Sequence, residues 1–256
     1  MTYKIDGVPI SEYGATPALA GQSYALHGVC DLPKRVGTTE HNWGTSIEPF
    51  VESDDIKLDG RTLTLHVAIK EDRLQTFLDA CIDCGELSTG FDTFDVVCKD
   101  EVAVQEFGPW RIVTVPFWQE YFELKPLVYS PSGSGDYRLD NFNLNKDFKV
   151  LVSEINGSSN MARRIEVQTT EFYQRTNFRS TRAIDLTCVL HAKSATTNMF
   201  EIIYENMCQF HAALMAPGMR ELNLRNNSFF VYFKDGMSVE NVANNIARFN
   251  LKATVI

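Results

Sequence analysis

The feature that most constrains the fold is an order of elements that occurs twice in the chain. Leu65-His66-Val67 lies 125 residues before Leu190-His191-Ala192, and an apolar run with helical spacing follows each tripeptide. Four further matches, at offsets of 129, 135, 135 and 137, join Arg35 to Arg164, Asp100 to Asp235, Val104 to Val239 and Arg111 to Arg248. The offset changes only across expected loops, which tolerate insertions. We expect a structural duplication, with two merely similar α+β domains as the alternative.

The first half contains one clear strand and helix. Alternating apolar residues over 63–69 predict a half-buried strand. Apolar residues with helical spacing over 74–82 predict an amphipathic helix that Asp72 would cap. Strands are also expected at 91–98 and 111–115. Because prolines flank the second of these, it should be short or lie at a sheet edge.

The second half follows the same order with a more apolar helix. The expected elements are strands at 164–169 and 184–192, a helix at 199–214, strands at 221–225 and 229–233, a short helix beginning at Ser238, and a final strand at 249–256. Apolar residues surround the helix at 199–214 almost completely, so it should be more buried than its counterpart.

Residues 130–136 read Ser-Pro-Ser-Gly-Ser-Gly-Asp, a sequence that favours a linker or the tip of a long hairpin. We therefore divide the chain into an N-terminal unit at 1–128, a linker or long hairpin at 129–147, and a C-terminal unit at 148–256. The expected fold class is mainly β (α+β), with one main α-helix in each of the two units.

Charge is distributed unequally along the chain. Residues 1–128 carry a net charge of −11 and residues 129–256 a net charge of +2, within a total of −9. The acidic balance argues against a general nucleic-acid binder, which needs excess lysine and arginine. The asymmetry suggests that the halves face different neighbours, although ordinary solubility explains it equally well.

The six cysteines favour synthesis in a reducing cytoplasm. They are too sparse for a disulfide scaffold, and the pair Cys81 and Cys84 lacks a second pair that would complete a zinc site. No apolar run approaches the roughly 20 residues of a membrane-spanning helix. The first residues do not resemble a signal peptide. We expect reduced structural thiols and no membrane association.

The sequence offers no catalytic, cofactor-binding or metal-ligating set, so we expect no cofactor and no enzymatic activity. His41 has no partner at ligand spacing. Glu52, Asp54 and Asp55 form an acidic cluster without the regular spacing of a calcium loop.

A basic loop in the second half is the best candidate for a functional surface. Arg175, Arg179 and Arg182 surround Phe178. Because arginine and aromatic residues are enriched at protein interfaces, we predict an oligomer interface at these four residues. Nucleic-acid contact is the alternative.

Short tokens in the first half suggest a family. Ile5-Asp6-Gly7-Val8-Pro9-Ile10, Pro33-Lys34-Arg35 and Trp43-Gly44, together with the chain length and the element order, resemble distal tail proteins of long-tailed bacteriophages or prophages. More broadly, the chain is similar to tail-tube and baseplate-hub proteins. The N-terminal half carries this resemblance best.

The resemblance implies a virion structural protein with a tail-tube fold, synthesised in the bacterial cytoplasm. Its units would be tail-tube-like β-sandwiches, each flanked by an α-helix, whose strands combine between copies into a homo-oligomeric ring around a channel. Such a ring, a hexamer or a trimer, connects the tail tube to the tip or the receptor-binding apparatus. Its partners are other phage tail proteins, and DNA is only passing cargo. The family's second domain is often galectin-like, but the long apolar helix of this second half departs from that pattern and favours a second tube unit.

Two other functions stay open. The chain could be a carbohydrate- or receptor-binding β module of a phage particle, with Trp110, Trp118 and Tyr121 exposed in a groove. An enzyme of unrecognised type would need a pocket with converging histidine and carboxylate side chains.

Overall fold

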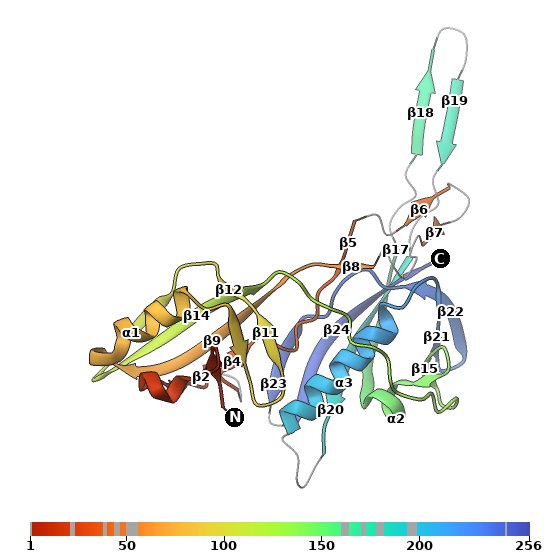
Figure 1. Cartoon of the computed structure of the whole chain (residues 1–256). Coiled ribbons are helices and arrows are strands. Elements are labelled where there is room, and N and C mark those ends of the chain that lie inside the picture. The colour runs from red at the N-terminus through yellow and green to blue at the C-terminus, as the bar shows by residue number, and fades with distance from the viewer. Residues whose placement is uncertain are drawn as a thin grey trace.

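The computed structural model describes residues 2–20, 24–37, 40–43, 47–49, 56–159, 164–169, 173–177, 182–193, 199–243 and 245–256. The fold is mainly β, as the alternating patterns predicted (Figure 1). Each of the two main sheets is built on one ten-residue antiparallel pair. The pairs are β9 (Arg61–Lys70) with β14 (Trp110–Gln119), and β20 (Arg182–His191) with β24 (Ile246–Val255).

The sheet of the N-terminal unit has β9 and β14 at its centre. On the far side of β14 lie β12 (Val97–Cys98) and β13 (Ala103–Phe107), and on the far side of β9 lie β3 (Thr16–Pro17) and β4 (Leu26–His27). The strand expected at 111–115 is part of β14, which has ten residues and a neighbour on each side, so the prediction of a short or edge strand is wrong. Pro116 is tolerated because its carbonyl, and hence its nitrogen, faces the gap between β12 and β13, where Lys99 N approaches at 3.5 Å.

Helix α1 (Glu71–Ile82) covers one face of this sheet and buries Phe77 and Cys81. The predicted stripe is present, but the cap is different. Lys70 occupies the N-cap position, without a side-chain hydrogen bond, because the helix follows β9 directly and leaves Asp72 inside the first turn.

A small sheet completes the N-terminal unit. Its strands are β1 (Lys4–Ile5), β2 (Val8–Pro9), β10 (Glu86–Ser88) and β11 (Thr93–Asp95), and the 3-10 helix η1 (Ile10–Tyr13) follows β2. The β1–β2 turn has positive φ angles at Asp6 and Gly7, as a two-residue hairpin turn requires. Asp6 N donates to Glu86 O at 2.8 Å, and Asp6 Oδ1 accepts Glu86 N at 2.8 Å.

The sheet of the C-terminal unit is larger. Besides β20 and β24 it contains β15 (Tyr137–Leu139), β16 (Phe142–Asn143), β17 (Val150–Ser159), β21 (Arg220–Leu224), β22 (Asn227–Tyr232) and β23 (Val239–Ala243). The helix predicted after Ser238 is wrong, since β23 is a strand. A bulge between Val239 and Asn241 shifts its side-chain phase, which gave the apolar residues a helix-like spacing.

The segment expected as a linker belongs largely to this second sheet. Strands β15 and β16 pair with each other, β15 also pairs with β21, and α2 (Leu144–Phe148) follows them. Leu139 and Leu144 are buried in the core. The stretch without helix or strand runs instead from residue 120 to residue 136.

Helix α3 (Met199–Leu214) is buried on nearly all sides, as predicted. Twelve of its sixteen residues are buried. Its side chains belong to a single hydrophobic core that includes residues of both units. Among the described residues, no helix has the length and apolar character needed to cross a membrane.

Each unit carries a ribbon inserted before its central strand. In the C-terminal unit, β18 (Arg164–Gln168) and β19 (Tyr173–Asn177) project away from the body (Figure 1); we call them the C-terminal arm. In the N-terminal unit, β5 (Arg35–Val36) pairs with β8 (Lys57–Leu58), and the short strands β6 (His41–Asn42) and β7 (Ile47–Glu48) pair with each other. We call residues 31–36 and 57–60 the N-terminal arm.

The element order of the two units is the same from end to end. A hairpin, a short helix, an edge segment, an arm, a long strand, a long helix, a second hairpin, an edge strand and a final long strand occur in each unit. Asp140 even repeats the turn of Asp6: it has a positive φ, donates to Glu221 O at 2.7 Å and accepts Glu221 N at 2.9 Å.

The strand register corrects some of the sequence matches and confirms others. The buried positions of β9 and β20 coincide at an offset of 121, so the match of Leu65 with Leu190 is four residues out. Likewise, Arg111 corresponds to Ala247 and not to Arg248. The match of Val104 with Val239 is confirmed, because these residues pair with Val113 and Phe249. These partners occupy the same place in β14 and β24.

Candidate functional site

The most elaborate polar contacts of the molecule lie where its two units meet. The N-terminal arm pairs there with the chain just before β23. Leu32 and Met237 exchange two backbone hydrogen bonds of 2.8 Å, and Arg35 N donates to Lys234 O at 2.9 Å. A Cβ on Gly236 would lie 2.2 Å from Leu32 O, so this backbone approach requires glycine.

Arg35 joins the N-terminal arm to the end of α3. Its Nη2 donates to Met215 O at 2.7 Å and to Ala216 O at 3.0 Å. These carbonyls follow the last turn of α3, where the helix dipole is negative and carbonyls lack intrahelical partners. Burial lowers the pKa of Arg35 to about 10, and the nearby Arg220 adds to the effect, so the guanidinium remains charged at neutral pH.

Arg61, the first residue of β9, is a second buried cation at this junction. It donates to Gln119 Oε1 at 2.8 Å, to Val29 O at 2.6 Å and to Asp31 O at 3.1 Å, and it is only 5% exposed. Its guanidinium lies over the Phe122 ring at 4.8 Å. Backbone carbonyls, the Gln119 amide and the Phe122 ring contact the guanidinium directly, and the Asp31 carboxylate also interacts with it electrostatically.

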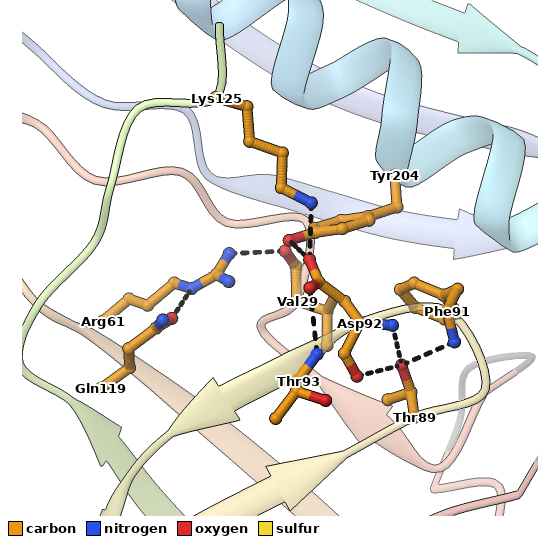
Figure 2. A network of polar contacts seen from close by, with 9 residues as sticks. All are labelled: Val29, Arg61, Thr89, Phe91, Asp92, Thr93, Gln119, Lys125 and Tyr204. Carbon is orange, nitrogen blue, oxygen red and sulfur yellow. Dashed lines mark hydrogen bonds and ion pairs between the residues drawn. The ribbon is translucent and has the colours of Figure 1, made fainter.

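Asp92 links the N-terminal unit to α3 (Figure 2). Lys125 Nζ and Tyr204 Oη each donate to Asp92 Oδ2 at 2.6 Å. Partial burial opposes ionisation of Asp92, but the hydrogen bonds from Lys125 and Tyr204 outweigh it and hold its pKa below the ordinary value. Burial also raises the pKa of Tyr204, which therefore stays protonated and donates.

A cavity of about 320 Å³ lies beside this network. It is lined by Arg61, Asp92, Gln119, Lys125 and Tyr204, among others. Asp92 is paired there with Lys125, and Arg61 is held by carbonyls; Asp95 and Glu123 also line the cavity. Asp92 is therefore a paired anion and not a free base, so the arrangement is suited to holding the units together.

His211 completes the junction from α3. Its Nε2 lies 3.0 Å from Pro33 O, which can only accept, so this nitrogen carries the proton. Burial lowers the pKa of His211 to about 4, although the contact with Pro33 opposes the shift. The imidazole is therefore a neutral donor at neutral pH.

The cysteines of the structure are all free thiols, as expected. Cys81 ends the buried stripe of α1, and Cys84 donates weakly to Glu86 O. Burial raises the pKa of both, that of Cys84 to about 12, so neither has the character of a reactive thiolate. No group of three or more histidine, cysteine or carboxylate residues able to hold a metal occurs in the part of the chain that the structure describes.

Two of the four predicted interface residues, Arg175 and Arg182, lie within the part of the chain that the structure describes. Arg175 belongs to β19, where its backbone pairs with Glu166. Arg182 is the exposed first residue of β20, opposite Ser159 and Val255. Phe178 and Arg179 fall outside the described residues, as do Glu52, Asp54 and Asp55 of the acidic cluster.

The aromatic residues considered for a binding groove are not gathered in one place. Trp110 and Trp118 occupy opposite ends of β14, about 26 Å apart along an extended strand. Lys70 lies over Trp110 and Lys99 over Trp118, while Tyr121 is 77% exposed.

The residues of the junction were not identified from the sequence. In the sequence, Arg35 stands out as one member of a repeated pair and as part of Pro33-Lys34-Arg35, whereas nothing marks Arg61, Asp92 or Tyr204 as members of a site. The repeated turn of Asp6 and Asp140 was a usable signal, because Ile5-Asp6-Gly7 and Leu139-Asp140-Asn141 place an aspartate at the same point of each unit. It would have extended the duplication to both hairpins.

Comparisons with known proteins give no further guide: no family model matches the chain, and neither the curated proteins nor the solved structures contain a match.

Proposed function

We propose that this chain is a structural component of a phage tail, in which copies join into a ring at the distal tail or baseplate hub. The ring would connect the tail tube to the tip or to the receptor-binding apparatus. In this proposal the chain works by docking onto copies of itself and onto other tail proteins, and it transforms no substrate.

The observation that carries the proposal is the duplicated unit with its internal junction. One unit docks head to tail on the other through Arg35, the hydrogen bond of Tyr204 to Asp92 and the backbone pairing of Leu32 with Met237. A head-to-tail contact that repeats between chains produces a closed ring when its rotation closes. With two units per chain, a trimer would place six units around a channel.

Self-assembly is tested by measuring mass against concentration. We expect sedimentation velocity to show particles three or six times the monomer mass of 29.0 kDa, and negative-stain images to show rings with a central hole. A mass of 29.0 kDa at every concentration would count against the proposal.

The place in the particle needs its own test. Antibody labelling of phage particles released from the source bacterium should mark the end of the tail tube. Labelling of the capsid, or no labelling of any particle, would contradict a distal tail role.

One observation favours the alternative, a carbohydrate- or receptor-binding module. Tyr121 lines the cavity beside Asp92 and Gln119, where an aromatic face and polar groups could meet a sugar. A glycan array probed with the monomer tests this function. Binding that Tyr121→Ala abolishes would support it, and the absence of any bound glycan would remove it.

A further inference from the structure

We infer that the C-terminal arm of one chain docks onto α1 and the β12–β13 edge of a second copy, so that the junction within the chain is repeated between chains. This inference rests on the proposed self-assembly and names the surfaces that perform it.

The internal junction supplies the template. The N-terminal arm docks on the end of α3 and on residues 234–239, which lead into β23. In the duplicated fold, β20 corresponds to β9, α1 to α3, and β13 to β23. The equivalent contact must therefore join the C-terminal arm to the end of α1 and the residues before β13. Within one chain, the C-terminal unit carries the first of these surfaces and the N-terminal unit carries the second, and the two do not meet. The contact therefore needs a second copy of the chain.

The donor side of this contact is uncovered in the single chain. Arg182 begins β20 as Arg61 begins β9, at the offset of 121 that aligns the two strands. Arg61 is only 5% exposed and is held by Val29 and Gln119 of its own unit, whereas Arg182 is exposed. Among the described strands, β17 beside it pairs with β20 alone, and its residues Leu151 and Ile155 are exposed.

The acceptor side is uncovered as well. Ile82 at the end of α1 is 61% exposed, Val97 of β12 is 54% exposed and Val104 of β13 is 41% exposed. On the C-terminal unit the corresponding end of α3 is covered by the N-terminal arm. Three large apolar side chains exposed near one sheet edge are typical of a surface that meets a partner.

The charges of the two surfaces are complementary. Residues 71–83, which include α1, contain four carboxylates and one arginine. Residues 160–182, which include the C-terminal arm, contain five arginines and two glutamates. Opposite charges on the two sides steer association and fix its orientation.

One position differs between the two junctions. The residue that corresponds to Gly236 is Glu101, at the same offset of 135 that joins Val104 to Val239. A side chain there prevents the close backbone approach that Leu32 makes to Gly236. The contact between chains should therefore be looser than the junction within the chain, and assembly should depend on concentration.

Two variants that each lack one surface provide the test. The acceptor variant carries Ile82→Glu and Val97→Glu. The donor variant replaces residues 160–181 by Asn-Gly, which can join Ser159 to Arg182 because these residues are paired neighbours in β17 and β20. Arg182→Glu is a second donor variant that leaves the arm in place. Phe230→Glu, at an apolar residue of β22 that is 59% exposed, controls for the added charge.

We expect each donor or acceptor variant alone to need at least a tenfold higher concentration than the wild type for assembly, with an unchanged melting temperature for the substitutions. Phe230→Glu should assemble like the wild type. A mixture of donor and acceptor variants retains one intact surface of each kind, so it should form a heterodimer and nothing larger.

The outcomes separate the inference from the proposed function. If the wild type stays monomeric, the proposed self-assembly fails, and the interface fails with it. If the wild type assembles and the acceptor variant assembles equally well, only this interface is overturned. A mixture that forms no heterodimer would also overturn it.

Discussion

The rings of His27 on β4 and His66 on β9 lie against each other, with centroids 4.3 Å apart and planes tilted by 50°, and His66 Nδ1 is 3.1 Å from Thr114 Oγ1. Burial, and then the neighbouring His27, lowers the pKa of His66 to about 4, and burial also lowers the pKa of His27. Asp31 acts in the opposite direction on His27. The two adjacent imidazoles therefore stay neutral at pH values at which free histidines begin to take up protons.

The lowered pKa values of these two histidines predict a loss of stability in mild acid. Between pH 6.5 and about 4 the unfolded chain binds more protons than the folded chain, so stability falls as the pH falls through this window. We expect His66 to contribute about 1–2 kcal/mol, less than its full shift, because solvent screens a partly exposed ring. Thermal unfolding between pH 7 and 4.5 measures the effect. His66→Asn should flatten the pH dependence, whereas His41→Asn on the exposed strand β6 should not. Equal slopes for both variants would contradict the prediction.

Arg35 should contribute more to the free energy of unfolding than a surface arginine does. Arg35→Met keeps much of the apolar stem but leaves Met215 O and Ala216 O at the end of α3 without their donor. We expect a loss of about 2–3 kcal/mol in the free energy of unfolding, measured by urea denaturation. Lys34→Met is the matched control, because the Lys34 side chain is 60% exposed. A loss for Arg35→Met no larger than that of the control would show that the contact with α3 contributes little.

Gly236→Ala should weaken the junction between the units. The added Cβ would lie 2.2 Å from Leu32 O and 2.7 Å from Lys34 N, and both are backbone atoms that cannot turn aside. We expect a destabilisation of about 2 kcal/mol or more, with earlier exposure of the junction to proteases. Gly90→Ala is the control, since its Cβ would meet nothing within 4 Å. Similar melting temperatures for both variants would contradict the close approach.

Deletion of Leu251–Ile256 should prevent folding. These residues form the second half of β24, which pairs with β20 on one side and with β22 on the other. Their removal takes Leu251 and Ala253 out of the core and leaves the first half of β20 unpaired on one side. We expect an insoluble product on expression. Soluble protein with an unchanged melting temperature would show that β24 is not central to the sheet.

Most of the secondary structure could be predicted from the sequence, because period-two and helical spacings report directly on burial. The alternation at Leu63 to Ile69 and the helix at 199–214 are both present. The failures have local causes: a bulge at Glu240 imitated a helix, and a gap between neighbouring strands let Pro116 enter a central strand. The junction could not be predicted, because Arg35 and Arg61 bind backbone carbonyls of distant residues and no sequence pattern marks a carbonyl acceptor.

The burial of α3 has a consequence for how the chain can be divided. The helix belongs to the C-terminal unit by topology, but its side chains Phe200, Tyr204 and His211 meet rings and carbonyls of the N-terminal unit. A protein cut between the units would expose that face to water. The molecule should therefore unfold in one cooperative step. Neither unit should fold independently when it is produced without the other.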